Sequence, residues 1–407
     1  MKRVEDHLAD VLAGVVPLEP LDVQLLDAHG CVLAEDVVAP ADLPGFDNSS
    51  VDGYAVRLAD VADASPDSPA VLPVVGDIAA GSRSAYRVQE GFTARIMTGA
   101  PVPAGAEAIV PVEWTDGGVA TVQITREPQP GQHVRRQGED VQAGEKVLTA
   151  GTRLGPPQIS LLAAVGRARA VVRPRPRVVV ISTGSELVEP GQPIGFGQLY
   201  ESNSFVLTAA AREAGAVGYR VGNVPDDPRT VLAAIEDQLI RADLVVTSGG
   251  VSAGAYDVVK EVLTRLGTVR FDKVAMQPGM PQGFGTIGPD RTPILTLPGN
   301  PVSAYVSFEV FVRPVIRRML GVEPLHRPTV RAVVTEPFGS PAGKRQYARA
   351  WLDQEGERAV VRPVGGSGSH LVGDLAHANA LIVVPEEVTH VPAGGTVNVM
   401  VLERRQT

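Results

Sequence analysis

Hydrophobic and polar positions follow different patterns in successive parts of the chain, and each pattern predicts a different kind of structure. Between Val4 and Val15, apolar residues recur every three or four positions, which predicts a helix that ends before Pro17. From about residue 21 to 170, short apolar runs alternate with turns, as is typical of strands. The clearest runs cover 32–40, 94–99, 106–114 and 119–125, and a short helix is expected over 156–165. We expect this front part to be β-rich and not one compact unit.

The middle of the chain alternates strand and helix patterns. Strands are expected over 178–183, 217–224, 244–250 and 294–299, and helices over 204–215, 227–242, 257–267 and 302–320. This alternation predicts a parallel sheet with helices on both faces. Pro314 lies inside the last helix and should kink or break it.

After Gly321 the pattern returns to short β-type runs. They cover 329–336, 358–364, 380–387 and 397–402. These runs predict a small all-β domain at the C-terminal end. The length of 407 residues fits two to four domains in total.

Composition and charge exclude several classes of protein. The chain is 44% hydrophobic and 20% charged, as globular proteins are. A net charge of −9 argues against nucleic-acid binding, because phosphate backbones attract clustered positive charge. The single cysteine, Cys31, can form neither an internal disulfide nor a thiolate metal cluster. No run has the length of a membrane span, and the charged start differs from a signal peptide, so a cytoplasmic protein is expected.

Three polar or glycine-rich loops follow the predicted parallel strands, over 182–187, 247–257 and 297–303. In an open α/β sheet, ligands bind beyond the carboxyl ends of the strands. Glycines allow backbone N–H groups to approach an anion closely, so three such loops at one edge predict a phosphorylated, nucleotide-like ligand. Each loop taken alone is also compatible with an ordinary turn. The Lys-Ser/Thr pair of a phosphate loop is absent, which argues against a kinase.

Carboxylates gather at the same predicted edge. Glu186 follows the first strand, Asp226 and Asp227 follow the second, and Asp257 follows the third. Acidic groups beside a phosphate site repel it unless a cation lies between them, and oxygen ligands suit Mg²⁺. The alternative is that Asp226, Asp227 or Asp257 caps a helix.

Four other segments are most simply interpreted as turns or surface ion pairs. They cover 46–56, 95–110, 135–141 and 366–370. The last segment places Ser369 beside His370 in a glycine-rich loop, which by itself indicates only a turn.

The segments together resemble one family. DNSSVDGYA, RIMTGAPVPAGAEAIV, RRQGEDV, STGSEL, TSGGVSAGAYD, VAMQPGMPQGFG, LPGNPVSAY and GSGSH occur in the order found in the molybdopterin molybdenumtransferases, the MoeA family, which includes the E domain of gephyrin. The resemblance covers nearly the whole chain. It implies an enzyme that inserts molybdenum from molybdate into adenylylated molybdopterin and releases AMP.

The resemblance also implies a fold and an assembly. The fold is multidomain α/β plus β, with an elongated N-terminal domain over 1–42 and 135–171, an inserted β-rich domain over 43–134, a central doubly wound α/β domain over 172–321 and a C-terminal β domain over 322–407. Family members form homodimers, with the site between the central domain of one subunit and the inserted domain of the other. A molybdopterin adenylyltransferase is expected as a partner.

Site residues are carried over by position. The residues matched to catalysis are Asp52, Thr98, Glu186, Asp226, Asp257 and Lys273. The residues assigned to substrate binding are Arg135, Asp140, Ser248, Gly249, Gly250, Ser252, Pro298, Gly299, Asn300, Ser303, Arg349 and Ser369. We expect Mg²⁺ as cofactor, held by Asp226, Asp257 and Glu186.

One loop departs from the family pattern. Where the family often has KPGKP, with lysines linked to oxyanion binding, this chain has Gln277 and Met280. Two alternatives follow: Lys273, Arg345 or Arg349 supplies the missing positive charge, or the affinity for molybdate is low. Two other functions stay open at this point, a molybdopterin adenylyltransferase and a non-catalytic scaffold of the same fold. The N-terminal part and the C-terminal β domain favour a molybdenumtransferase over an adenylyltransferase. The set of carboxylates favours an enzyme over a scaffold.

Overall fold

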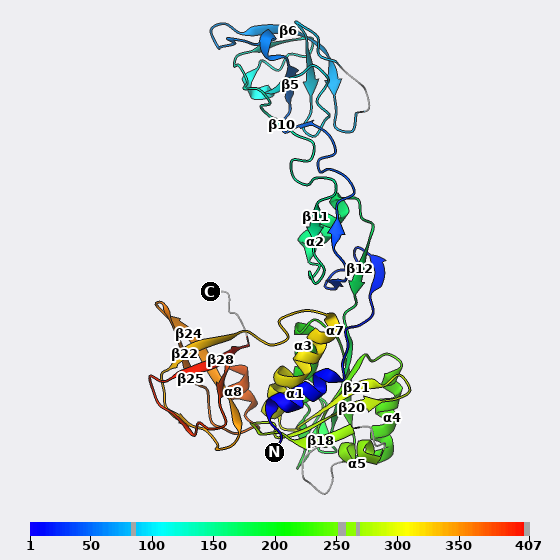
Figure 1. The fold of residues 1–407 in the computed structure, drawn as a ribbon, viewed down its shortest axis with the longest axis vertical. Coiled ribbons are helices and arrows are strands. Elements are labelled where there is room, and N and C mark those ends of the chain that lie inside the picture. Colours follow the sequence, from blue (N-terminus) through cyan, green and yellow to red (C-terminus); the bar gives the residue numbers. More distant parts are fainter. Residues whose placement is uncertain (83–86, 251–257, 266–268, 403–407) are drawn as a thin grey trace. The chain divides into compact units, whose positions relative to one another are not determined.

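The computed structural model describes residues 1–82, 87–250, 258–265 and 269–402. The chain folds into two compact units (Figure 1). Unit 1 comprises Met1–Leu21, Gly30–Val32 and Val172–Thr407, and unit 2 comprises Asp22–His29 and Leu33–Val171. None of the helices in the described residues has the length and apolar character needed to cross a membrane.

A six-stranded sheet forms the centre of unit 1, with strand order β16-β13-β17-β21-β20-β18. Its strands are β13 Arg177–Thr183, β16 Val217–Val224, β17 Leu244–Ser248, β18 Val269–Lys273, β20 Pro281–Ile287 and β21 Thr292–Leu297. The four strands expected from the sequence are parallel, which confirms that prediction. β20 runs antiparallel to both β21 and β18, so the carboxyl ends of β13, β17, β21 and β18 share one edge with the amino end of β20.

Helices cover both faces of this sheet, as predicted, because alternate residues of β13 point to opposite faces. Val178 and Val180 belong to one buried cluster, and Val179 and Ile181 belong to the other. The helices over the first cluster are α1 Val4–Ala13, α3 Asn203–Glu213, α6 Pro301–Ser307 and α7 Arg313–Leu320. The helices over the second cluster are α4 Pro228–Leu239 and α5 Val258–Arg265.

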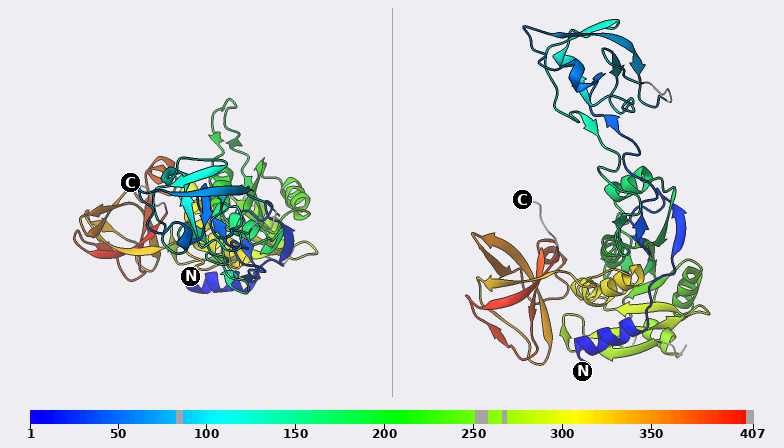
Figure 2. Two further views of the ribbon diagram at one scale, coloured as in Figure 1. Left: turned by 90° about the horizontal axis from the view of Figure 1, so that it is seen from above. Right: turned by 45° about the horizontal axis from the view of Figure 1, so that its top comes forward.

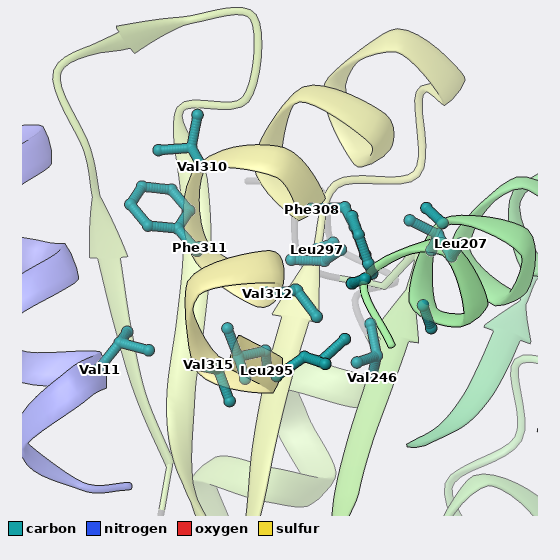
Figure 3. Packing of buried hydrophobic residues seen from close by; sticks show 14 of the residues in the cluster. Val11, Leu207, Val246, Leu295, Leu297, Phe308, Val310, Phe311, Val312 and Val315 are labelled. Carbon is teal, nitrogen blue, oxygen red and sulfur yellow. The ribbon is translucent and has the colours of Figure 1, made fainter. Parts of the chain in front are cut away.

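Figure 3 shows how the first cluster packs. Phe308 lies against Leu297 of the sheet, and Val11 of α1 enters the cluster from the side. Val11 is fully buried, and burying such a side chain contributes about 1.5–3 kcal/mol. This packing explains why the first residues of the chain belong to unit 1 and not with the segment around 135–171.

The long helix expected over 302–320 is interrupted. α6 is followed by a π-helical turn, η3 Phe308–Val312, before α7 begins at Arg313. Pro314 is in the first turn of α7, where it has no N–H to donate to the preceding turn. The predicted break is therefore confirmed, and it lies just before the proline.

A β-barrel forms the C-terminal part of unit 1 (Figure 2). Its strands are β22 Thr329–Val334, β24 Arg345–Glu355, β25 Arg358–Pro363, β26 Ala380–Val384 and β28 Thr396–Val401. Pairing of β24 with β26 closes the sheet, and β19 Met276–Gln277 pairs with the start of β24. The smaller elements are β23 Phe338–Gly339, β27 His390–Val391, α8 Val372–Ala376, β14 Leu187–Val188 and β15 Leu199–Tyr200.

Unit 2 contains a five-stranded sheet with order β8-β5-β7-β6-β9. Its strands are β5 Gly53–Val56, β6 Ala70–Ile78, β7 Thr93–Ile96, β8 Ala108–Pro111 and β9 Thr121–Ile124. The remaining elements are β3 Val37–Val38, β4 Asn48–Ser49, β10 Val134–Arg135, β11 Lys146–Leu148, α2 Pro156–Ala164 and the turns η1 Leu58–Asp60 and η2 Val112–Trp114. The chain passes between the units near β1 Leu21–Gln24, β2 Val32–Leu33 and β12 Arg169–Arg173.

Candidate active site

A pocket of about 790 Å³ lies at the carboxyl edge of the central sheet. It is formed by the loops after β13, β17 and β21 and by the start of α3. The predicted site residues that line it are Glu186, Asp226, Ser248, Gly249, Gly250, Pro298, Gly299, Asn300 and Ser303. The three loops expected to meet at one sheet edge thus contribute to the same pocket.

Glycines allow two of these loops to pack against each other. Gly249 has a φ of +99°, and a Cβ there would lie 2.4 Å from the backbone oxygen of Thr183. A Cβ on Gly299 would lie 3.5 Å from the Cα of Gly249, so the third loop passes close to the second. Only glycine fits at position 249, because both the backbone angle and the space exclude a side chain.

The two adjacent aspartates after β16 have separate roles. Asp227 is the N-cap of α4 and accepts hydrogen bonds from the backbone N–H and the hydroxyl of Thr230, at 2.8 and 2.7 Å. Asp226 lines the pocket, and its carboxylate accepts a hydrogen bond from the backbone N–H of Ser185 at 3.2 Å. The backbone N–H of Asp226 donates in turn to the Ser185 hydroxyl. The capping alternative therefore holds for Asp227 and leaves Asp226 available to a ligand.

Glu186 and Asp226 are the acidic members of the predicted metal set that the described residues bring to this pocket. Asp257, the third member, and Ser252 lie outside the described residues. Within the described ranges there is no group of three His, Cys, Asp or Glu side chains placed to hold a metal ion.

A second pocket of about 280 Å³ lies between the QPGMP loop and the barrel, and Arg349 and Gln277 line it. Arg349 is 5% exposed, and its guanidinium donates to the backbone oxygens of Gly366 and Gly368. Its Nε has no hydrogen-bond partner. Burial lowers the pKa of Arg349, against the weaker opposing effect of Asp374, whose carboxylate is 3.8 Å away.

Arg345 and Lys273, the other two residues expected to supply positive charge, do not line this second pocket. Arg345 forms ion pairs with Glu5 and Glu386, so its charge is already neutralised. Lys273 ends β18 at the edge that carries the first pocket but is not among the residues that line either pocket. Of the three, Arg349 alone lines a pocket that Gln277 also lines.

The glycine-rich loop 365–372 connects the two pockets. Gly366 and Ser367 line the second pocket, while His370 and Val372 line the first. The backbone oxygen of Ser369 accepts a hydrogen bond from the N–H of Val302, which ties the loop to the start of α6. The structure thus places predicted Ser369 in the loop between the two pockets, hydrogen-bonded to the start of α6.

Four predicted residues lie in unit 2. The Asp52 carboxylate accepts hydrogen bonds from the backbone N–H and the hydroxyl of Thr98, at 2.7 and 2.8 Å, and these bonds lower the pKa of Asp52. Arg135 and Asp140 line a pocket of about 520 Å³. The neighbouring Arg136 forms an ion pair with Asp47, so the surface ion pair expected for segment 135–141 joins it to segment 46–56.

Several residues that line the first pocket were not predicted. They include Thr183, Tyr200, Asn203 and His370. The sequence signal for Asn203 is an Asn at the start of a predicted helix, which usually indicates only a cap. His370 is adjacent to the predicted Ser369 and was interpreted as part of a turn.

The fold is that of an α/β domain with a polar, glycine-lined pocket at the carboxyl edge of its central sheet. The MoeA N-terminal region (domain I and II) matches residues 2–166, a probable molybdopterin binding domain matches 179–318, and the MoeA C-terminal region (domain IV) matches 331–402. The chain therefore belongs to the MoeA family of molybdopterin molybdenumtransferases.

Individual relatives support this assignment. Molybdopterin molybdenumtransferase 2 of Mycobacterium tuberculosis is 50% identical over 97% of this chain and 98% of its own length. The molybdopterin molybdenumtransferase of Bacillus subtilis is 36% identical over 93% and 89%. A crystal structure of a molybdopterin biosynthesis MoeA protein from Pyrococcus horikoshii aligns with a TM-score of 0.80 and 33% identity, covering 99% of both chains.

Proposed function

We propose that this protein inserts molybdenum from molybdate into molybdopterin, that the molybdopterin enters in adenylylated form, and that AMP leaves. The observation that carries the proposal is the convergence of Glu186, Asp226 and the Gly249 and Gly299 loops on one pocket at the sheet edge. A pterin nucleotide has a phosphoanhydride, and this pocket offers it both glycine backbone without side chains and two carboxylates. A molybdopterin adenylyltransferase would supply this substrate.

The donors in the pocket fit a magnesium ion. Mg²⁺ is commonly held by one or two carboxylates together with substrate phosphates and water, and Glu186 and Asp226 provide two carboxylates. When bound, the ion would neutralise charge on the phosphates and polarise phosphorus. Ser185 orients the Asp226 carboxylate. The backbone of Gly249 and Gly250 would hold the phosphates, since no side chain blocks their approach.

Molybdate, as the second substrate, would bind in the pocket that Arg349 lines. The guanidinium is held in place by two backbone oxygens, and its Nε hydrogen is unused. Gln277 offers an amide in place of a family lysine, so the positive charge at this pocket is smaller than the family pattern supplies. We infer that molybdate binding depends strongly on Arg349.

Asp52, Thr98, Arg135 and Asp140 would act from the partner subunit of a homodimer. This part of the proposal follows from the family resemblance. The hydrogen bonds from Thr98 hold Asp52 ionised and fixed in direction, as a group that meets a substrate should be.

Product analysis tests the proposed function. Purified protein is incubated with adenylylated molybdopterin, Mg²⁺ and molybdate, and we expect AMP release that requires molybdate. Formation of adenylylated molybdopterin from ATP would identify an adenylyltransferase instead. Neither reaction, with intact binding of molybdopterin, would indicate a scaffold.

Substitution of Gly249 with Ala tests the close packing of the loops. We expect at least about a tenfold loss of AMP release, because the added Cβ forces the second loop away from Thr183. The control is Gly394→Ala, which introduces a Cβ at a φ of +80° with no atom within 4 Å. Both variants place a side chain at a positive φ, +99° and +80°, so equal activities would show that the contact with Thr183 has no effect on the pocket.

A further inference from the structure

Asn203 joins the start of α3 to the end of β17 and to the loop after β21 through one side chain. It is the first residue of α3, is 7% exposed and lines the pocket. Its Nδ2 donates to the Ser248 hydroxyl at 2.9 Å and to the backbone oxygen of Gly299 at 2.6 Å. The Ser248 hydroxyl donates onward to the backbone oxygen of Pro298.

These bonds determine which end of the amide faces the loops. The Gly299 oxygen can only accept, so the NH₂ end of Asn203 must face it. The Oδ1 end is therefore directed elsewhere, and it is buried without a hydrogen-bond partner. A buried amide oxygen without a donor is unfavourable, and in a residue that lines a ligand pocket it is a vacant acceptor.

The backbone under Asn203 is held firmly. The carboxylate of Glu201, which is 1% exposed, accepts the N–H of Ser204 at 2.8 Å. Arg220 donates to the Ser204 hydroxyl at 2.6 Å and lies 3.6 Å from Glu201. Asn203 therefore has little freedom to turn its oxygen toward another protein group.

We propose that Asn203 is a substrate-binding residue whose Oδ1 accepts a hydrogen bond from an N–H of the bound heterocycle, while Nδ2 fixes the loops around it. The inference rests on the proposed function, because that function supplies ligands with such groups. The donor is an amino or ring N–H, which both the pterin and the adenine of the substrate carry. Asn203 meets one of these two rings.

The test measures binding and turnover by Asn203→Ala. AMP affinity is measured by calorimetry and molybdopterin affinity by fluorescence, because AMP carries only the adenine and molybdopterin only the pterin. We expect about a tenfold rise in Kd for one of the two, as the loss of a buried hydrogen bond predicts, and a matching rise in KM. The affected ligand identifies the ring that Asn203 contacts.

The matched control is Thr208→Val, which removes another buried polar group without a hydrogen-bond partner, a hydroxyl of α3 outside the pocket. It should bind both ligands as the unmodified protein does. If Asn203→Ala does not fold, Asn203→Ser replaces it, since its shorter side chain cannot make the same bonds. Unchanged Kd values for both ligands in a folded Asn203 variant would overturn the inference. Failure of the proposed function is separate, because it would appear as missing AMP release by the unmodified protein.

Discussion

Asp226→Asn is expected to reduce molybdate-dependent AMP release by at least about a hundredfold while the protein stays folded, as is typical when a positioned ionisable group is removed from a reacting centre. The carboxylate lines the pocket and is oriented by Ser185, yet it makes no contribution to capping a helix. The amide keeps the shape but removes the negative charge proposed to hold Mg²⁺. The measurement is the initial rate of AMP formation, with thermal unfolding as a check of the fold.

The adjacent residue provides the control. Asp227→Ala removes the N-cap of α4 and should lower the free energy of unfolding by about 1 kcal/mol. Its rate of AMP release should remain close to that of the unmodified protein. A loss of activity in Asp227→Ala with normal activity in Asp226→Asn would contradict this account, because it would show that the reaction depends on Asp227 and not on Asp226.

Glu309→Ala is expected to cause the largest loss of stability, about 3–5 kcal/mol, because it removes the buried counter-charge of Arg313 and Arg327 and leaves them with the half-exposed Glu213. Glu309 is completely buried in η3 and accepts hydrogen bonds from Arg313 at 2.6 Å and from Arg327 at 2.9 Å. Arg327 also contacts the backbone oxygen of Leu402 and so connects the helix to the end of the barrel. Urea unfolding followed by circular dichroism measures the loss.

The control for Glu309 is Glu213→Gln, because Glu213 contacts the same two arginines but its side chain is 52% exposed. Exposed ion pairs contribute little, so a loss of less than about 1 kcal/mol is expected. Burial alone would raise the pKa of Glu309, but the hydrogen bonds and charges of Arg327 and Arg313 lower it overall. This contribution to stability is complete above the ordinary pKa of glutamate and is lost as pH falls through the lowered value. Equal losses in both variants would contradict this account.

The sequence predicted the parallel part of the fold because buried strands form continuous apolar runs between turns. β16 Val217–Val224 coincides with the expected strand, and β13 and β17 differ from theirs by at most two residues at an end. The strands that were not predicted include β18, β20 and β24. β20 contains two glycines and begins just after the turn at Pro278 and Gly279, so its sequence resembles a turn. β24 includes many polar and charged residues and lacks a continuous apolar run. Its place in the sheet depends on packing against neighbouring strands.

The site was predictable in its location but not in all its residues. Strand ends that share a sheet edge bring Glu186, Ser248 and Gly299 together, and the sequence order contains this information. Which of Asp226 and Asp227 caps α4 and which lines the pocket depends on the direction of each side chain. Asn203 contributes through bonds to residues about 45 and 96 positions away, which no local pattern records.

The most direct test of the central claim is a structure of the protein crystallised with AMP and molybdopterin. The account predicts that the phosphate lies against the backbone of Gly249 and Gly250 and that Glu186 and Asp226 face it across the pocket. Binding of both ligands at another site, with this pocket empty, would contradict it.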